Sequence, residues 1–251
     1  MKLINIIAGL LFGFTTVQVT AQDVNYYVIS KQAAPFQIEN NENQHSGIVT
    51  DIVKKIFEDS RYAINYHSYP FNRMISILED GGQPNWITYG SPSWGGVQAE
   101  NLSEEPIYTV KHVLLSSKNN EFTFKDMKDI NNKIVVLLHG FDYPQLIPYI
   151  ESGKIEELRV KDYQAAFRIV NKLQGVATFV EMDSRIKYNF AKLGLDDKQY
   201  KTQSFNIVIP DYSIYLALDP NMDKSIQQFI NNKLKSMKSN GELDRIVNQY
   251  I

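Results

Sequence analysis

Beyond residue 22, short apolar runs alternate with stretches in which apolar residues recur every three or four positions. A short run bounded by turn residues predicts a buried strand, and the wider spacing predicts a helix with one face packed inward. The first part of the chain therefore predicts strands at 24–30, 62–66 and 86–89, and helices at 48–57 and 71–78. This β-α-β-α-β order is typical of a parallel sheet with crossover helices.

The same pattern restarts after an extended apolar segment at 110–117 and a polar stretch at 118–132. Further strands are predicted at 134–138, 155–160, 176–180 and 213–218. Further helices are predicted at 142–151, 162–173, 184–193, 226–237 and 243–250. The second of these begins with Asp162 as its capping residue. Two α/β units follow one another without a spacer rich in proline, glycine or serine, so we expect two lobes rather than two independent domains.

The segment 85–108 carries the clearest candidate for a binding site. Its strand at 86–89 ends in a loop of small residues, Gly90-Ser91-Pro92-Ser93. Open α/β sheets bind their ligands at the carboxyl ends of the strands. We therefore expect this loop to form one wall of a binding cleft, and the segment after it to make the first crossing between the lobes.

Residues 1–21 predict a secretory signal peptide that is cleaved before Gln22. Lys2 provides the positive start, 4–14 the apolar stretch and 19–21 the small-residue cleavage site. The alternative is an uncleaved membrane anchor, for which the apolar run is short. The chain contains no cysteine, which excludes disulfides and a lipid-bearing cysteine. We expect an exported, unlipidated protein of the bacterial periplasm.

Charge and motif content exclude several classes of function. The formal net charge is −2 and no basic run occurs, so nucleic acid and anionic membranes are not expected partners. A 43% hydrophobic and 12% aromatic content argues against disorder. The four histidines lack metal-ligand spacing, and no nucleotide-binding or nucleophile motif is present. We expect no metal, no cofactor and no catalytic residue.

Five segments in order resemble one family. They are APFQIENNENQHSGIVTDIVKKI, YPFNRMISILEDG, LSEEPIY, KIVVLLHGFDY and LKSMKSNGELDRIVNQY. Together they make the chain from Tyr26 to Ile251 similar to the bacterial extracellular solute-binding proteins of the polar-amino-acid class, the periplasmic partners of import transporters.

This resemblance implies a two-lobed α/β fold, the type II periplasmic-binding-protein fold, with two hinge strands. Lobe 1 would hold residues 22–111 and 209–251, and lobe 2 residues 112–208. The implied function is capture of a small polar or amine-bearing solute in the interlobe cleft by a monomer that presents it to the permease of an ABC-type importer. One alternative is a ligand sensor acting on a membrane receptor. Another is an enzyme like cyclohexadienyl dehydratase, which would need cationic carboxylate clamps.

The sequence departs from the family where amino-acid binders hold their ligand. The arginine that clamps the ligand carboxylate falls on Gly96, and a hydroxyl residue of the second lobe is replaced by Asp142. The aspartate for the ligand amino group falls near Met182, and we favour Glu181 in that role. Arg73 is the alternative clamp if its side chain turns into the cleft.

We therefore expect a ligand other than a standard α-amino acid held in the usual way, such as an amine or a neutral solute between aromatic walls. Asp142 or Glu181 would supply the counter-charge. The expected ligand-binding residues are Phe36, Arg73, Tyr89, Ser91, Ser93, Trp94, Gly140, Phe141, Asp142, Tyr143 and Glu181.

Several of these residues also have a plain structural interpretation. Trp94 would cover the hinge, Arg73 would be a surface arginine, and Asp142 would cap a helix. Tyr143 would serve packing alone. The two serines of the loop would be ordinary turn residues.

Overall fold

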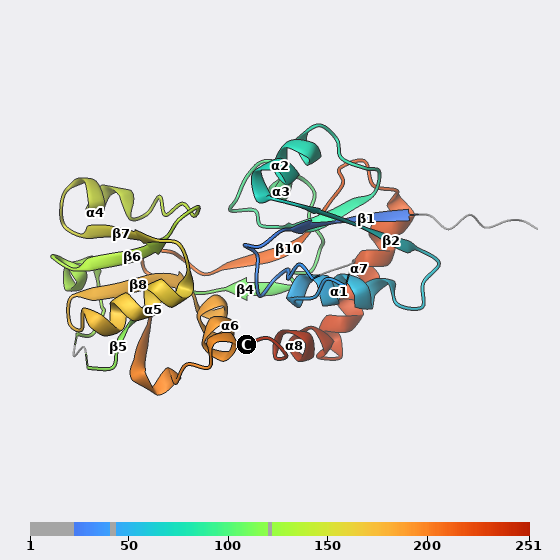
Figure 1. The fold of residues 1–251 in the computed structure, drawn as a ribbon. Helices are drawn as coiled ribbons and strands as arrows, with labels where there is room; N and C mark the ends of the chain where they lie inside the picture. The colour runs from blue at the N-terminus through green and yellow to red at the C-terminus, as the bar shows by residue number, and fades with distance from the viewer. Residues whose placement is uncertain (1–22, 41–43, 120–121) are drawn as a thin grey trace, which may run out of the picture.

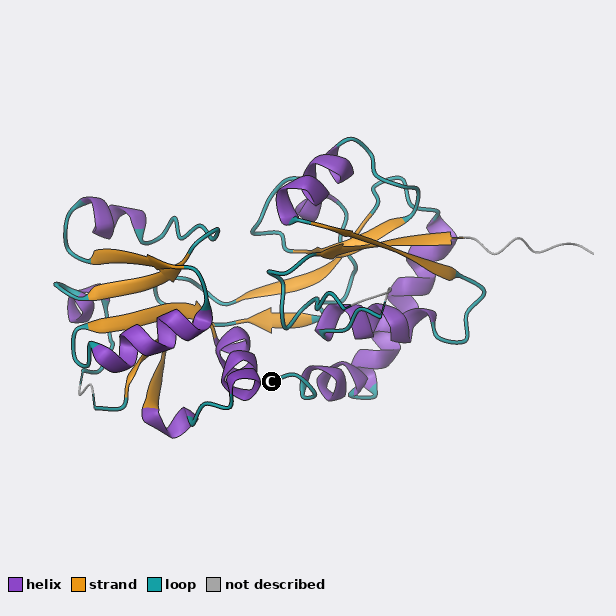
Figure 2. Ribbon diagram, viewed as in Figure 1, coloured by secondary structure: helices purple, strands orange, loops and turns teal. Residues whose placement is uncertain are grey.

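The computed structural model describes residues 23–40, 44–119 and 122–251, and the predicted signal peptide lies outside them. Two five-stranded sheets, each with its own helices, form two lobes joined by extended chain (Figures 1 and 2). The two-lobed α/β fold predicted from the sequence is confirmed.

The first sheet has the strand order β2-β1-β3-β10-β4. Its strands are β1 (Asp23–Ile29), β2 (Ala63–Tyr69), β3 (Trp86–Gly90), β4 (Tyr108–Val110) and β10 (Tyr212–Leu218). Its helices are α1 (Ile48–Phe57), α2 (Phe71–Glu79), α3 (Val97–Glu100), α7 (Lys224–Ser239) and α8 (Glu242–Val247). Strand β1 pairs in parallel with β2 and β3, as the β-α-β-α-β pattern predicts, while β10 is antiparallel to β3 and β4.

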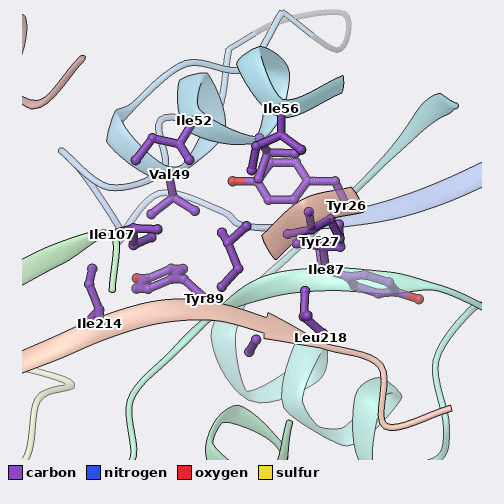
Figure 3. Close-up of a cluster of buried hydrophobic side chains, with 14 of the residues drawn as sticks. Tyr26, Tyr27, Val49, Ile52, Ile56, Ile87, Tyr89, Ile107, Ile214 and Leu218 are labelled. Atoms are coloured by element: carbon purple, nitrogen blue, oxygen red, sulfur yellow. The ribbon is translucent and has the colours of Figure 1, made fainter. Parts of the chain in front are cut away.

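The core of the first lobe gathers the inward faces of the sheet and of α1 and α7. Trp86, Tyr26 and Ile52 are among its fully buried side chains, and Figure 3 shows the part of the cluster around the last two. The buried Tyr26 hydroxyl accepts a hydrogen bond from the Gln37 side chain at 2.8 Å and lies 3.1 Å from the Thr50 hydroxyl. These partners satisfy a polar group that burial would otherwise leave costly.

The second sheet has the strand order β7-β6-β8-β5-β9. Its strands are β5 (His112–Ser117), β6 (Ile134–Leu138), β7 (Glu156–Val160), β8 (Ala177–Met182) and β9 (Tyr200–Ser204). Its helices are α4 (Ile147–Glu151), α5 (Tyr163–Lys172) and α6 (Asp183–Leu193), with 3₁₀ turns η2 (Met127–Ile130) and η3 (Asp197–Gln199). Strand β6 is parallel to β7 and β8, and β5 is antiparallel to β8 and β9.

Two details of the second lobe differ from the prediction. The helix expected to begin at Asp142 begins at Ile147 instead, so Asp142 is an exposed loop residue and not its cap. Pro144 explains the difference, because the residue before a proline is disfavoured in the helical region. Strand β9 was not predicted, since its residues YKTQS carry no apolar run.

The chain crosses between the lobes twice, at neighbouring positions. Lys111 separates β4 in the first sheet from β5 in the second, so the first crossing comes after β4. The second crossing joins β9 to β10. The two lie side by side, because Val110 pairs with Tyr212 and the Phe205 amide donates to the His112 carbonyl at 3.0 Å.

Candidate functional site

The loop after β3 is held tightly against α3. A Cβ atom on Gly90 would lie 1.8 Å from the Gln98 carbonyl oxygen, so only glycine fits there. The Gln98 side chain in turn donates to the Tyr89 carbonyl at 2.7 Å. Ser91 is fully buried, and its carbonyl accepts from the Trp94 amide at 3.0 Å. The serine therefore shapes the turn that presents Trp94.

A chain of ring contacts runs from this loop to the second lobe. Phe36 stacks on Tyr89 with 6.0 Å between the ring centroids, and Tyr89 packs edge-on against Trp94 with 5.6 Å between the centroids. Trp94 contacts Tyr212 of β10 at 6.1 Å, and Tyr212 lies 6.0 Å from His112 at the start of β5. Trp94 is 38% exposed while Tyr89 is 4% exposed. The tryptophan thus lies against a crossing strand with part of its ring open to solvent.

A buried ion pair of the second lobe, Glu181 and Arg185, lies near this series of ring contacts. Glu181, in β8 and 2% exposed, accepts hydrogen bonds from the Met182 amide at 2.7 Å and the Tyr163 hydroxyl at 3.0 Å. Arg185, on the first turn of α6, brings Nη1 to 4.0 Å from Glu181 Oε1. Helix α6 is tied to the first crossing, because the Asp183 amide donates to the Lys111 carbonyl at 2.9 Å.

Arg185 is 5% exposed, and its guanidinium lies 4.6 Å above the Phe141 ring. Its Nε and Nη1 have no hydrogen-bond partner among the residues that the structure describes. Burial raises the pKa of Tyr89 to about 12, and the charge of Arg185 opposes that rise. Burial also raises the pKa of the Tyr212 hydroxyl, opposed first by a hydrogen bond with Trp94 and then by the charge of Arg185. The guanidinium is therefore within electrostatic reach of first-lobe residues.

The charge of Arg185 also shifts the pKa values of two groups in and beside the second lobe, His112 and Glu181. Burial and, second, the charge of Arg185 lower the pKa of His112 to about 4, and its Nδ1 has no hydrogen-bond partner within the described part of the chain. Burial raises the pKa of the Glu181 carboxyl, while Arg185 and the two hydrogen bonds lower it. We call the set Tyr89, Trp94, His112, Phe141, Tyr163, Glu181, Arg185 and Tyr212 the interlobe cluster.

The structure brings some of the predicted site residues together and leaves others apart. Tyr89, Trp94, Phe141 and Glu181 belong to the interlobe cluster, and Phe36 backs Tyr89. Tyr143 is buried nearby, where burial and the charge of Glu181 raise the pKa of its hydroxyl.

The remaining predicted residues lie toward solvent or shape the chain. Gly140, Asp142 and Ser93 are exposed, and Gly140 has a φ of +84°. Arg73 is also exposed, on α2, with its guanidinium 5.2 Å above the Tyr69 ring. This contact ties Arg73 to its own lobe.

Sequence reasoning missed Arg185, His112, Tyr163 and Tyr212. A usable signal for Arg185 was its position four residues after Glu181 at a predicted helix start, the spacing at which helical side chains meet. The two expected positions for a cationic clamp, Gly96 and Arg73, both lie in the first lobe.

Two surface hollows lie elsewhere. One of about 810 Å³ is bounded by Trp86, Gly96 and Asp219, and one of about 690 Å³ by α1 and α8 residues such as Asp51 and Glu242. Neither includes a member of the interlobe cluster. Within the described residues, no helix has the length and apolarity to cross a membrane, and no group of three or more His, Asp or Glu is placed to hold a metal ion.

Comparison with known proteins gives both a sequence match and fold matches. The profile of the bacterial extracellular solute-binding proteins, family 3, matches residues 27–251. A search of curated proteins finds no match.

Among solved structures, an amino acid ABC transporter substrate-binding protein from Streptococcus pneumoniae Canada MDR_19A, bound to L-arginine, is 15% identical, with 91% of this chain and 94% of that chain covered and a TM-score of 0.64. The second substrate-binding domain of Lactococcus lactis GlnP, in open conformation, is 17% identical, with 95% and 98% covered and a TM-score of 0.60. An ancestral amino-acid-binding protein described as a precursor of cyclohexadienyl dehydratase is 16% identical, with 91% and 94% covered and a TM-score of 0.62. At these identities the structural similarity establishes the fold.

Proposed function

Because this chain belongs to the bacterial extracellular solute-binding proteins, family 3, we propose that it captures a small polar solute between its lobes and presents it to an ABC-type importer. The observation that supports this most is the interlobe cluster. It sets a buried ion pair among aromatic rings from both lobes, beside the two crossings. Aromatic walls with a few convergent polar groups are what small-molecule sites require.

The lobes would move about the two crossings. We propose lobe 1 as residues 22–111 and 210–251 and lobe 2 as 112–209. The second boundary is one residue later than the sequence predicts, because Ile209 packs in the core of the second sheet. A solute that contacts both lobes binds the closed arrangement better than the open one. It therefore shifts the population toward closure, the form that a permease recognises.

The test is a thermal-melt screen of the protein without its predicted signal peptide against amino acids, polyamines, aromatic amines and short peptides. A solute at about one hundred times its dissociation constant adds roughly 2.7 kcal/mol to the free energy of unfolding. We expect a clear shift with at least one class. A melt that no member of these four classes moves would overturn the capture function.

We propose that the site residues are Tyr89, Trp94, Phe141 and Glu181, with the neighbouring loop residues shaping the walls. Trp94→Ala should weaken solute binding, because it removes a ring that spans the loop and β10. Phe71→Ala is the matched control, since Phe71 is 41% exposed on α2.

Export and partnership follow from the same family. We propose cleavage before Gln22 and a mature, monomeric protein in the periplasm, with a membrane permease as partner. The mass of the protein recovered from the periplasm of a bacterial host checks the cleavage site. A sensor receptor is the alternative partner, and genetic neighbourhood with a permease or with a histidine kinase distinguishes the two.

We propose binding rather than catalysis. The solved structures compared above are described as amino-acid-binding or substrate-binding proteins, although one is also described as a dehydratase precursor. Glu181, the carboxylate of the interlobe cluster, is already engaged by Tyr163 and the Met182 amide. Incubation with prephenate or arogenate should yield no aromatic product, and formation of one would establish an enzyme instead.

A further inference from the structure

Arg185 is a buried cation with unused donors. A guanidinium stays charged at any pH at which the protein folds and carries five N–H donors. Two of its nitrogens, Nε and Nη1, find no acceptor among the described residues although the side chain is only 6% exposed. Burying unpaired charged donors is costly, so a binding partner for them is the simplest reason to keep them there.

Glu181 compensates this charge without satisfying those donors. Its closest approach to Arg185 is 4.0 Å, beyond hydrogen-bond distance. Its oxygens are turned to the Met182 amide and the Tyr163 hydroxyl instead. Glu181 is therefore already paired with a cation, which makes it a poor counter-charge for an amine ligand.

The surroundings of Arg185 suit the remainder of a small organic solute. Its guanidinium lies over Phe141, and its charge acts on Tyr89 and Tyr212 of the first lobe. His112 lies at the first crossing between the lobes, against the Tyr212 ring, and its Nδ1 has no hydrogen-bond partner among the described residues. An anionic group placed at Arg185 would thus sit between the lobes, with rings of both lobes around it.

We propose that Arg185, acting from the second lobe, binds a carboxylate of the solute and that the aromatic rings of the interlobe cluster hold the rest of it. This inference rests on the proposed capture function and names its substrate class. The ligand is a small carboxylic acid, amino acids included, rather than the amine or neutral solute expected from the sequence. Arg185 takes the role for which the family position in this chain offers only Gly96.

The first experiment compares solutes that differ only at the carboxylate. Isothermal titration is run with L-phenylalanine, L-phenylalaninamide and phenethylamine, with the equivalent sets built on L-glutamine and L-arginine, and with inorganic phosphate. We expect binding by the acid of at least one set, and binding weaker by roughly tenfold to a hundredfold for its amide and its amine. Phosphate, which offers an anion without an organic remainder, should bind no more tightly than the amides.

The second experiment changes Arg185 while protecting the fold. Arg185→Lys keeps the charge, and the double variant Arg185→Met with Glu181→Gln leaves neither partner as an unpaired buried charge. Arg168→Lys is the matched control, because Arg168 is an exposed arginine on α5 of the same lobe. We expect Arg185→Lys to weaken binding of the acid by roughly tenfold or more, the double variant to abolish its preference over the amide, and the control to leave both unchanged.

The outcomes separate this inference from the capture function. If amides or amines bind as well as the acids, or if phosphate alone binds, capture stands and the carboxylate assignment to Arg185 falls. The assignment also falls if both Arg185 variants bind the acid as the wild type does. If neither the acids, the amides, the amines nor phosphate bind, the carboxylate assignment falls, and the melt screen alone decides whether the capture function stands.

Discussion

At the scale of single residues, the proposed site contains polar groups whose pKa values burial has shifted. His112 lies where β5 begins, against the ring of Tyr212, and burial together with the charge of Arg185 lowers its pKa to about 4. His112 and Tyr212 do not stand out in the sequence, because only the fold brings them to the other members of the interlobe cluster. Their roles could not be predicted from local patterns, which report only whether a segment packs inward.

The lowered pKa of His112 predicts a pH dependence of stability. In the unfolded chain the imidazole binds a proton below its usual pKa of 6.5, whereas in the folded protein it stays neutral until about pH 4. The unfolded state therefore binds more protons in this window, and stability is lost as pH falls through it. The loss amounts to about 3 kcal/mol from His112 alone.

Urea unfolding of the wild type and His112→Gln at pH 7.5 and 4.5 measures this contribution. The variant should lose less stability on acidification by about 2–3 kcal/mol. Contributions from Glu181, His45 and His67, whose pKa values burial also shifts, cancel in the difference. Equal acid losses in the two proteins would contradict the prediction.

Gly90 predicts a steric effect at the start of the site loop. Gly90→Ala places a Cβ atom 1.8 Å from the Gln98 carbonyl oxygen, so the backbone must shift. We expect a loss of about 3 kcal/mol or more in urea unfolding, at the upper end of overpacking costs. Gly81→Ala is the control, because it has a φ of +106° but nothing within 4 Å of its Cβ, and strain alone costs about 1 kcal/mol. Equal losses in the two variants would show that the loop yields easily.

At the scale of elements, the hydrophobic pattern predicted the strands and helices that bury apolar side chains. Helix α5 begins as expected, with the Asp162 carboxylate accepting from the Ala165 amide at 2.7 Å. The pattern failed where burial is weak or where proline intervenes. Strand β9 is a polar edge strand held by pairing with β5, and α4 starts late because of Pro144. Both failures concern contacts or turn chemistry that periodicity does not record.

One element contact leads to a separate prediction. The Tyr250 hydroxyl, beyond α8, accepts from the Gly47 amide at 2.9 Å and donates to the Asp51 carboxylate, so it joins the C-terminal segment to the start of α1. Tyr250→Phe should lower the free energy of unfolding by about 1–2 kcal/mol. Tyr188→Phe, whose hydroxyl makes no hydrogen bond to the described residues, should change it little. A loss no greater than in this control would show that solvent replaces the contact.

At the scale of the whole molecule, the two-lobed arrangement could be predicted because the α/β pattern occurs twice and the five family segments follow in order. The candidate site could be predicted only in part. The family resemblance pointed to Tyr89, Trp94 and Glu181, whereas His112, Arg185 and Tyr212 join them only where the crossings bring the two sheets together. The rings of Tyr89 and Tyr212 both contact Trp94 there, and the charge of Glu181 acts on Tyr212.

The proposed closure of the lobes predicts a measurable change in the distance between them. The chain has no cysteine, so Ser76→Cys on α2 and Ser152→Cys after α4 introduce two unique labelling sites, both exposed. In Figure 1 both helices lie along the upper side of the molecule, one on each lobe. Energy transfer between attached dyes should rise when the solute found in the melt screen is added. A pair within one lobe, Ser76→Cys with Ser239→Cys, should not respond. An unchanged transfer in the interlobe pair would exclude closure.

The neighbouring crossings also make the second lobe an insertion with adjacent ends. Val110 and Tyr212 are direct partners in an antiparallel pair, the geometry that a two-residue hairpin turn can close. The whole of the second lobe thus occupies the place of a surface loop, where inserted domains are readily tolerated. A shuffled gene that exchanged this lobe alone would carry over Arg185 and its counter-charge while leaving the first sheet intact. Under the proposed role of Arg185, the preference for a carboxylate would transfer together with this lobe.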